Sequence, residues 1–287
     1  MAKSGEDTEK QKKTAHWRVD PKLATMPAVP PDVFLYVAVG LFGATFGSFL
    51  NVCIHRLPRH ESVVWPSSRC PACGGRIAPY DNVPILSFLW LRGRCRACRA
   101  PISFRYPLVE AANGLGYVWI AQQFGLGWSA AAYALLFSAL LVITFIDLDH
   151  QIIPDRITLP GIPLGILCAA TVLPTGLLNS VLGVLLGGGL LWFMAWISPY
   201  LFGQEGMGGG DIKLLAMVGA FLGWEPVLLT VLVGASIGAM TGLFLIALKR
   251  LRRDQHVPFG PFLALGAVVA IFFFNDLKTW YAGFFVP

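Results

Sequence analysis

Two aspartates stand at the edges of apolar segments in this chain, where an ionisable side chain is costly. Asp147 closes one apolar run, and Asp211 follows five glycines in the stretch GQEGMGGGDIK at 203–213. An ionisable residue at the membrane marks a functional site by default. Two carboxylates in contact in a low-dielectric site share a proton, so that one activates water while the other protonates or polarises a carbonyl. The pair therefore predicts hydrolysis of a peptide bond, provided that the fold brings Asp147 and Asp211 together.

Further residues near the same edges are candidates for supporting roles. They are Glu110, Asp149, Asp155, Gly208, Gly210 and Lys213. Glu110 could attract a basic group of a substrate or pair with an arginine, and Asp149 and Asp155 could orient the site or cap a helix. The glycines allow close approach of the backbone or of a substrate strand. The alternative is a flexible loop in which Asp211 caps the next helix and Lys213 anchors it.

The composition places the chain among integral membrane proteins. Of 287 residues, 55% are hydrophobic and 13% are charged, whereas soluble domains carry about 25% charged residues. The mean hydropathy is +0.63, and the repeated apolar runs favour helices over a barrel, whose strands would alternate. We expect an all-α polytopic membrane protein with about eight transmembrane helices, the sixth of them short. The predicted spans are 33–54, 107–124, 129–146, 157–176, 181–202, 212–224, 226–248 and 259–275.

The basic residues predict the orientation of these spans. Nine arginines against two acids lie in segment 56–105, four more Lys/Arg form KRLRR at 249–253, and the outer connections carry no Lys or Arg. The positive-inside rule places both clusters in the cytoplasm, and eight spans put them on the same side. Asp147 and Asp211, 64 residues apart, both fall at that boundary. Basic residues on a cytoplasmic face account for the net charge of +6, so we expect no nucleic-acid partner.

The polar insert at 56–105 contains two CxxC pairs, CPAC at 70–73 and CRAC at 95–98. This spacing is typical of a four-cysteine zinc site that holds together a domain too small for a large core. The predicted ligands are Cys70, Cys73, Cys95 and Cys98, which makes the site structural rather than catalytic. Two disulfides are the alternative, which a reducing cytosol disfavours. No HExxH pattern is present, and the five histidines form no i, i+4 ligand pair.

Several motifs, in order, resemble those of the bacterial type IV prepilin peptidases, which are membrane aspartic proteases of the GxGD class. They are FGSFLNVCIHRLP at 46–58, the two CxxC pairs, YPLVE at 106–110, IDLDHQIIPD at 146–155 and GMGGGDIKLLA at 206–216. The resemblance covers about residues 36–275. It implies catalysis by Asp147 and Asp211 and removal of a short basic leader from type IV prepilins or pseudopilins. It also implies N-methylation of the new terminus with S-adenosylmethionine, for which the residues alone indicate no site.

The resemblance implies a multi-pass protein of the bacterial inner membrane whose active site faces the cytoplasm. We expect a disordered tail at 1–30, a first transmembrane helix within 31–55, the zinc insert at 56–105 and a peptidase core at 106–287. The alternatives are a non-enzymatic channel or transporter with a zinc-binding regulatory loop and a peptidase without methyltransferase activity. Acids clustered at one face favour the protease, since transporters place charges near the midplane.

Overall fold

The computed structural model describes residues 33–202, 208–249 and 257–283, and each structural statement below concerns these ranges. The chain divides into two units, Met1–Leu35 and Tyr36–Pro287, and the architecture described is that of the second. The predicted disordered tail lies outside the described residues. So do residues 206 and 207 of the glycine-rich motif and all of the KRLRR cluster except Lys249.

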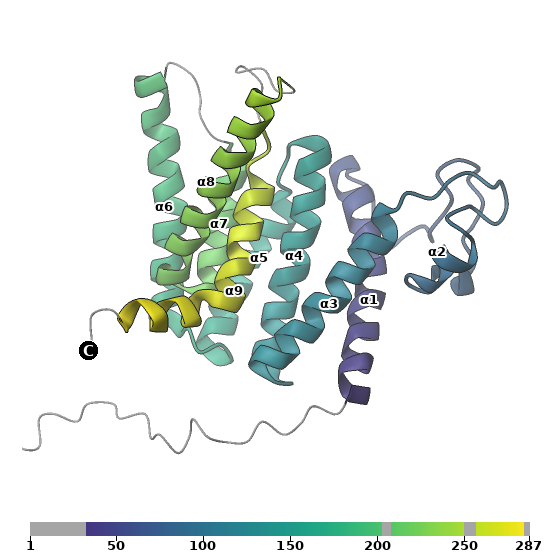
Figure 1. Ribbon diagram of the computed structural model, residues 1–287, viewed down its shortest axis with the longest axis horizontal. Helices are drawn as coiled ribbons and strands as arrows, with labels where there is room; N and C mark the ends of the chain where they lie inside the picture. Colours follow the sequence, from purple (N-terminus) through teal and green to yellow (C-terminus); the bar gives the residue numbers. More distant parts are fainter. Residues whose placement is uncertain (1–32, 203–207, 250–256, 284–287) are drawn as a thin grey trace, which may run out of the picture. The chain divides into compact units, whose positions relative to one another are not determined.

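Helices make up the whole secondary structure of the described residues, apart from two isolated β-bridges in the insert (Figure 1). Eight helices are long: α1 (Val33–Arg56), α3 (Arg105–Phe124), α4 (Trp128–His150), α5 (Asp155–Thr171), α6 (Leu177–Phe202), α7 (Gly209–Leu222), α8 (Trp224–Ala247) and α9 (Gly260–Ala282). The insert between α1 and α3 holds a short helix, α2 (Leu86–Trp90), and two 3₁₀ turns, Leu57–Arg59 and Pro79–Asn82. The prediction of an all-α fold is confirmed.

Each long helix corresponds to one predicted span. In the described ranges, α1, α4, α6, α8 and α9 are long and apolar enough to cross a membrane, which makes this a multi-pass membrane protein. The total of eight spans stays a prediction, because α3, α5 and α7 are shorter or less apolar. Connections as short as Gly125–Gly127 and Gly223 reverse the chain direction between consecutive helices (Figure 1).

Two predicted span ends differ from the helix ends by five residues or more. The fourth span was expected to reach residue 176, but α5 ends at Thr171, because Pro174 has no N–H and Gly176 adopts a φ of +74°. The last span was expected to end at 275, but α9 continues to Ala282. The polar residues that end its apolar run remain helical, and Lys278 among them pairs with Glu225 at the start of α8.

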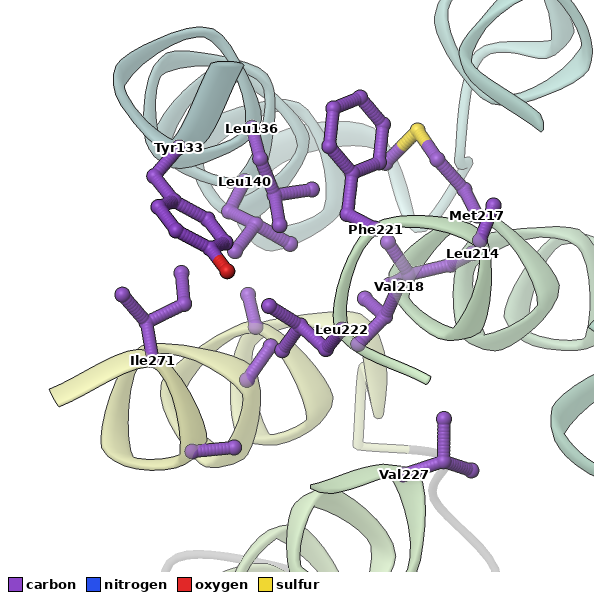
Figure 2. Close-up of a cluster of buried hydrophobic side chains, with 14 of the residues drawn as sticks. Tyr133, Leu136, Leu140, Leu214, Met217, Val218, Phe221, Leu222, Val227 and Ile271 are labelled. Atoms are coloured by element: carbon purple, nitrogen blue, oxygen red, sulfur yellow. The ribbon is translucent and has the colours of Figure 1, made fainter. Parts of the chain in front are cut away.

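Helix α7 is the most enclosed element. Its 14 residues span about 21 Å at 1.5 Å per residue, less than the roughly 30 Å of a hydrocarbon core. Leu136 and Leu140 of α4 and Ile271 of α9 belong to the same cluster of buried apolar side chains as Val218 and Phe221 of α7 (Figure 2). Because protein rather than lipid surrounds α7, a short helix is tolerated at this place.

Buried hydrogen bonds connect α4 to the first two long helices. Asn113 of α3 donates from Nδ2 to the Gly43 carbonyl of α1 at 2.8 Å and accepts at Oδ1 from the Ser138 hydroxyl of α4 at 2.9 Å. The Tyr117 and Ser138 hydroxyls are 3.1 Å apart. Inside a membrane such bonds hold helices together at defined positions, since lipid offers no competing partner. They fix the helix that carries Asp147.

The contact between α6 and α7 depends on two glycines. A Cβ at Gly183 would overlap the backbone carbonyl of Gly219, and a Cβ at Gly219 would overlap the carbonyl of Gly183. Small residues of this kind let two transmembrane helices approach until their backbones touch. Neither backbone can move aside cheaply, because α7 is packed on its other faces as well.

We expect Gly183→Ala to lower the stability of the folded protein by about 1–3 kcal/mol, the usual cost of overpacking. Gly189→Ala in the same helix is the matched control, since nothing lies within 4 Å of its Cβ position. Thermal unfolding of both variants in detergent, followed by tryptophan fluorescence, measures the difference. Equal melting temperatures for the two variants would contradict the close α6–α7 contact.

Candidate active site

Asp147 lies in the last turn of α4 and is 5% exposed. Its Oδ2 accepts a hydrogen bond from the backbone N–H of Gly260, the first residue of α9, at 3.0 Å. A Cβ at Gly260 would stand 2.6 Å from the same oxygen, so a larger residue there would displace the carboxyl group from this position. The N-terminal end of α9 therefore holds the Asp147 carboxyl group and places a positive helix end beside it.

Asp211 lies in the first turn of α7 and is 9% exposed. Its backbone N–H donates to the Gly208 carbonyl at 3.2 Å. Its Oδ1 is buried and has no hydrogen-bond partner within the described residues. A buried carboxyl oxygen without a partner is costly in a structural role, and such a group is typical of sites that receive a ligand or a water molecule.

The fold brings the ends of α4, α7 and α9 together around Ile153. A Cβ built at Gly210, next to Asp211, would lie 2.9 Å from Ile153 Cβ. A Cβ built at Gly260 would lie 3.2 Å from Ile153 Cδ1. The carboxyl group of Asp147 acts electrostatically on that of Asp211. Two acids that are far apart in the sequence thus share one buried site, the arrangement in which carboxylates share a proton.

Of the two predicted glycines, only Gly210 is required by close packing. A Cβ at Gly208 would lie 3.8 Å from Asp211 Oδ2, which is an ordinary van der Waals contact. The backbone of Gly208 is extended, with φ −75° and ψ 144°, so it does not require glycine either. Sequence reasoning missed Gly260 and Ile153. The Gly-Pro pair at 260–261 that opens the last apolar run was the available signal for Gly260.

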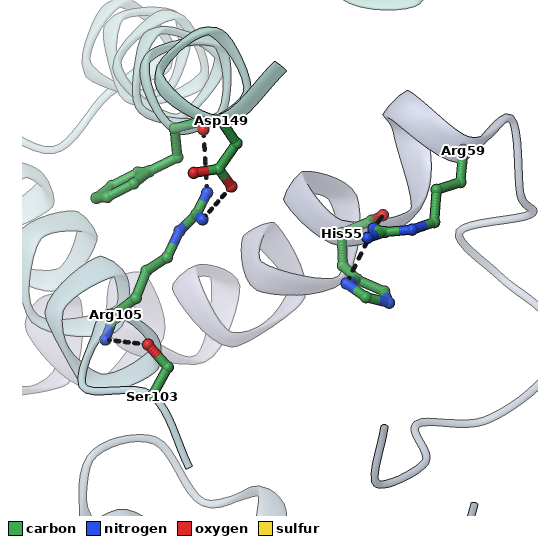
Figure 3. Close-up of polar contacts among 6 residues, drawn as sticks. His55, Arg59, Ser103, Arg105 and Asp149 are labelled. Carbon is green, nitrogen blue, oxygen red and sulfur yellow. Dashed lines mark hydrogen bonds and ion pairs between the residues drawn. The ribbon is translucent and has the colours of Figure 1, made fainter. Parts of the chain in front are cut away.

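Two ion pairs flank the aspartates and hold the supporting acids. Lys213 donates from Nζ to both oxygens of Asp155 at 2.7 and 2.8 Å, which joins α7 to the first turn of α5. Arg105, at the start of α3, pairs with Asp149 and donates to the Phe145 carbonyl at 3.1 Å (Figure 3). Lys213 is two residues from Asp211, and Asp149 is two residues from Asp147, so both ion pairs lie beside the aspartates.

Glu110 faces a different part of the molecule. Its Oε2 accepts the backbone N–H of Ile85 in the insert at 2.8 Å. Gly47 of α1 lies against its backbone, where a Cβ would come 2.8 Å from Glu110 Cα. The alternative expectation of an arginine partner is not what the structure shows. Glu110 instead ties the insert to α1 and α3.

One further stretch of the sequence matches a catalytic motif. The stretch GASIG at 234–238 matches the G-x-S-x-G spacing of a serine nucleophile elbow, which needs a sharp strand-to-helix turn. Here it lies in the middle of α8, and Gly234 packs against the Phe262 carbonyl of α9. The pattern therefore serves helix packing.

The four cysteines of the insert form one cluster. Their sulfur atoms all lie within 4.8 Å of one another, and Cys70 Sγ and Cys98 Sγ are 3.9 Å apart. Tetrahedral zinc with bonds of about 2.3 Å needs sulfurs about 3.8 Å apart, so the donor set fits the ion. Backbone N–H groups of Cys73 and Ala72 lower the pKa of the Cys70 thiol to about 7, which favours the thiolate that a metal binds.

Both CxxC segments have the same backbone design. Cys70 N–H bonds to the Gly75 carbonyl at 2.9 Å, and Cys95 N–H bonds to the Ala100 carbonyl at 2.8 Å. The residue after each second cysteine is left-handed, with φ +70° at Gly74 and +61° at Arg99. Two equivalent turns thus present two thiols each to one point, and no disulfide joins the cysteines.

Comparison with known proteins identifies the family. Residues 41–124 match the family model described as Bacterial Peptidase A24 N-terminal domain, and residues 134–243 match that of the Type IV leader peptidase family. The prepilin leader peptidase/N-methyltransferase of Aeromonas hydrophila is 40% identical over 85% of this chain and 92% of its own length. The proteins of that name from Stutzerimonas stutzeri and Pseudomonas aeruginosa are 38% and 37% identical over 88% and 85% of this chain, and over 96% and 92% of their own lengths.

The chain belongs to the type IV leader peptidase family. The resemblance seen in the sequence motifs is thereby confirmed. The N-terminal match contains the cysteine cluster and Glu110, and the leader peptidase match contains both aspartates. Gly260 lies beyond the matched residues. No solved structure matches this member of the family.

We expect one zinc ion per chain in the purified leader peptidase homologue. Cys73→Ser should lower the bound zinc well below one equivalent, because three thiolates hold the ion less tightly than four. Cys168→Ser, in α5 and outside the cluster, is the control and should keep the zinc. Elemental analysis of the two variants decides the matter, and wild-type protein that is metal-free, fully active and intact in its thiols would contradict the assignment.

Proposed function

We propose that this protein is a membrane aspartic endopeptidase that removes the basic leader of type IV prepilins or pseudopilins and then N-methylates the new terminus. The observation that carries the proposal is the juxtaposition of Asp147 and Asp211, whose helix ends meet at Ile153, together with a buried Asp211 oxygen that has no hydrogen-bond partner among the described residues. Membership of the leader peptidase family and the names of the relatives support the substrate and both activities. Neither gives support to the channel alternative.

The chemistry follows from the shared proton of the pair. The ionised carboxylate takes a proton from water, whose oxygen attacks the scissile carbonyl carbon, while the protonated partner donates to the carbonyl oxygen. The tetrahedral intermediate then collapses, the C–N bond breaks and a carboxyl group returns a proton to the leaving amine. The pair titrates as a unit, so the two roles belong to the dyad as a whole. The Gly260 N–H keeps the Asp147 carboxyl group in position throughout.

The place of the site fits a substrate with a polar leader followed by an apolar segment. Asp147 ends a membrane-spanning helix, and Asp211 begins the enclosed helix α7. An apolar substrate segment can remain in the bilayer while its scissile bond reaches the helix ends. We infer from the positive-inside rule that this face is cytoplasmic and the membrane the bacterial inner membrane, since the arginine-rich insert lies at the same helix ends.

The proposed function involves two ligands, a zinc ion and S-adenosylmethionine. Zinc, held by Cys70, Cys73, Cys95 and Cys98, would supply structural cross-linking of the two CxxC turns. S-adenosylmethionine would donate the methyl group, which the N-methyltransferase names of the relatives support. We expect cysteine substitutions to affect methylation or stability more than cleavage, because the aspartates lie elsewhere.

Asp147→Asn and Asp211→Asn should each lower the rate of prepilin cleavage by at least about 10²- to 10⁴-fold, the usual share of acid–base catalysis. Both variants should remain folded, since asparagine keeps the size of the side chain. Asp276→Asn in α9 is the matched control and should cleave normally. The rates are measured with purified protein and a prepilin substrate, and near-wild-type cleavage by either site variant would disprove the dyad.

A further inference from the structure

Helix α2 of the insert exposes large apolar side chains. Leu86, Leu89 and Trp90 are 59%, 63% and 81% exposed on a helix of five residues. Phe88 on the same helix points the other way and packs edge-on against Phe104, with ring centroids 6.1 Å apart. Exposed apolar groups gathered in this way mark a contact with a membrane or a partner. We therefore expect the face of α2 that carries Leu86, Leu89 and Trp90 to contact a membrane or another molecule.

The position of α2 relative to the membrane-spanning helices follows from the Glu110 hydrogen bond. Ile85, the residue before α2, donates its backbone N–H to Glu110 Oε2 at 2.8 Å. Glu110 lies five residues beyond the start of α3 at Arg105, which corresponds to about 7.5 Å along the helix. Arg105 itself is level with the end of α4, because it pairs with Asp149 (Figure 3). The start of α2 is therefore level with the second turn of α3.

Helix α1 leads to the same level. Gly47 of α1 lies against Glu110, because its Cβ position is 2.8 Å from Glu110 Cα. Gly47 lies nine residues before the end of α1 at Arg56, about 13.5 Å along the helix. Both α1 and α3 thus place the start of α2 inward of their own ends, toward the apolar layer that α1 crosses.

The backbone at Ile85 is held in a strained form to make this contact. Its φ of 61° and ψ of −50° are those of a γ-turn, which is closed by a hydrogen bond from Leu86 N–H to the Pro84 carbonyl at 2.5 Å. A β-branched residue rarely adopts this region, so surrounding contacts must hold it there. The buried Glu110 carboxyl group is such a contact, which makes the placement of α2 a specific feature of the fold.

Basic residues lie beside the exposed apolar face of α2. The residues that follow α2 include the exposed arginines Arg92, Arg94 and Arg99. Asp81, one of two acids in the insert, is neutralised by Arg96, whose Nε lies 2.8 Å from Asp81 Oδ2, and this hydrogen bond lowers the pKa of Asp81. Within the described residues these three arginines form no ion pair. An apolar face beside basic residues is the composition of segments that lie in the interface of anionic membranes.

We propose that α2 is an interfacial helix that inserts Leu86, Leu89 and Trp90 into the boundary between the headgroups and acyl chains of the bilayer. Arg92 and Arg94 then lie at the level of anionic lipid phosphates. The four-cysteine cluster, which follows directly at Cys95, is thereby held at the membrane surface on the side of the helix ends that carry Asp147. This docking does not depend on the peptidase assignment.

The test uses the full-length protein in vesicles of mixed anionic and zwitterionic lipid. A fluorescent noncanonical amino acid is placed at position 90, or separately at Ser67 in the same insert or Leu232 in the middle of α8. The lipids carry a nitroxide quencher either at carbon 5 or at carbon 12 of the acyl chain. The carbon-5 quencher should act at position 90 at least about twofold more strongly than at position 67. Position 232 should respond more to the carbon-12 quencher.

A second comparison tests the anchor. Glu110→Gln keeps an acceptor for the Ile85 N–H and should keep the quenching at position 90, whereas Glu110→Ala should lower it toward the value at position 67. Quenching at position 90 no stronger than at position 67 in the wild-type protein would overturn the proposal. So would a probe at position 90 that is shielded from lipid by a second copy of the chain. The wild-type comparison stands even if Glu110→Ala fails to fold.

Discussion

Helix α7 is too short to cross a bilayer by itself, yet it carries Asp211 at its first turn and is buried along most of its length. It can persist in a membrane because α4, α5, α6, α8 and α9 all contact it. The backbones of α6 and α7 touch at Gly183 and Gly219, so α7 cannot move closer to α6. The burial of α7 therefore sets where Asp211 stands. It also removes water from around a carboxyl group, which is the condition under which two acids share a proton.

The partner acid is fixed by different means. Asp147 stands at the end of a long apolar helix and is held by the first N–H of α9, and a Cβ at Gly260 would displace its carboxyl group. Ion pairs between Lys213 and Asp155 and between Arg105 and Asp149 stand on either side. The second pair also connects the end of α4 that carries Asp147 to the start of α3, and hence to the insert.

The sequence was sufficient for those features that depend on composition and local spacing. Apolar run length predicts the long helices, and the two CxxC pairs predict a sulfur cluster because each turn brings two thiols together locally. The Asp147–Asp211 juxtaposition followed from charge placement, since both acids fall at the same side of the predicted membrane. Hydropathy failed at the end of α9, because it reports where lipid ends rather than where a helix ends.

Other features depend on long-range contacts that no local pattern encodes. The Gly260 N–H reaches Asp147 across 113 residues, and the strained turn at Ile85 is held by a carboxyl group 25 residues away. Helix α2 is short, and its apolar residues resemble an ordinary loop in the sequence. Asp149 and Asp155 were ambiguous for the same reason, because their partners Arg105 and Lys213 lie on other helices.

We propose that one site, built from Asp147 and Asp211, cleaves a leader from a prepilin whose new terminus is then methylated. This proposal is tested most directly by mass spectrometry of a prepilin incubated with the purified protein, with and without S-adenosylmethionine. We expect mature pilin in both samples and, with the methyl donor only, a product heavier by one methylene group. An intact prepilin in both samples, with the protein folded in detergent or lipid, would contradict it.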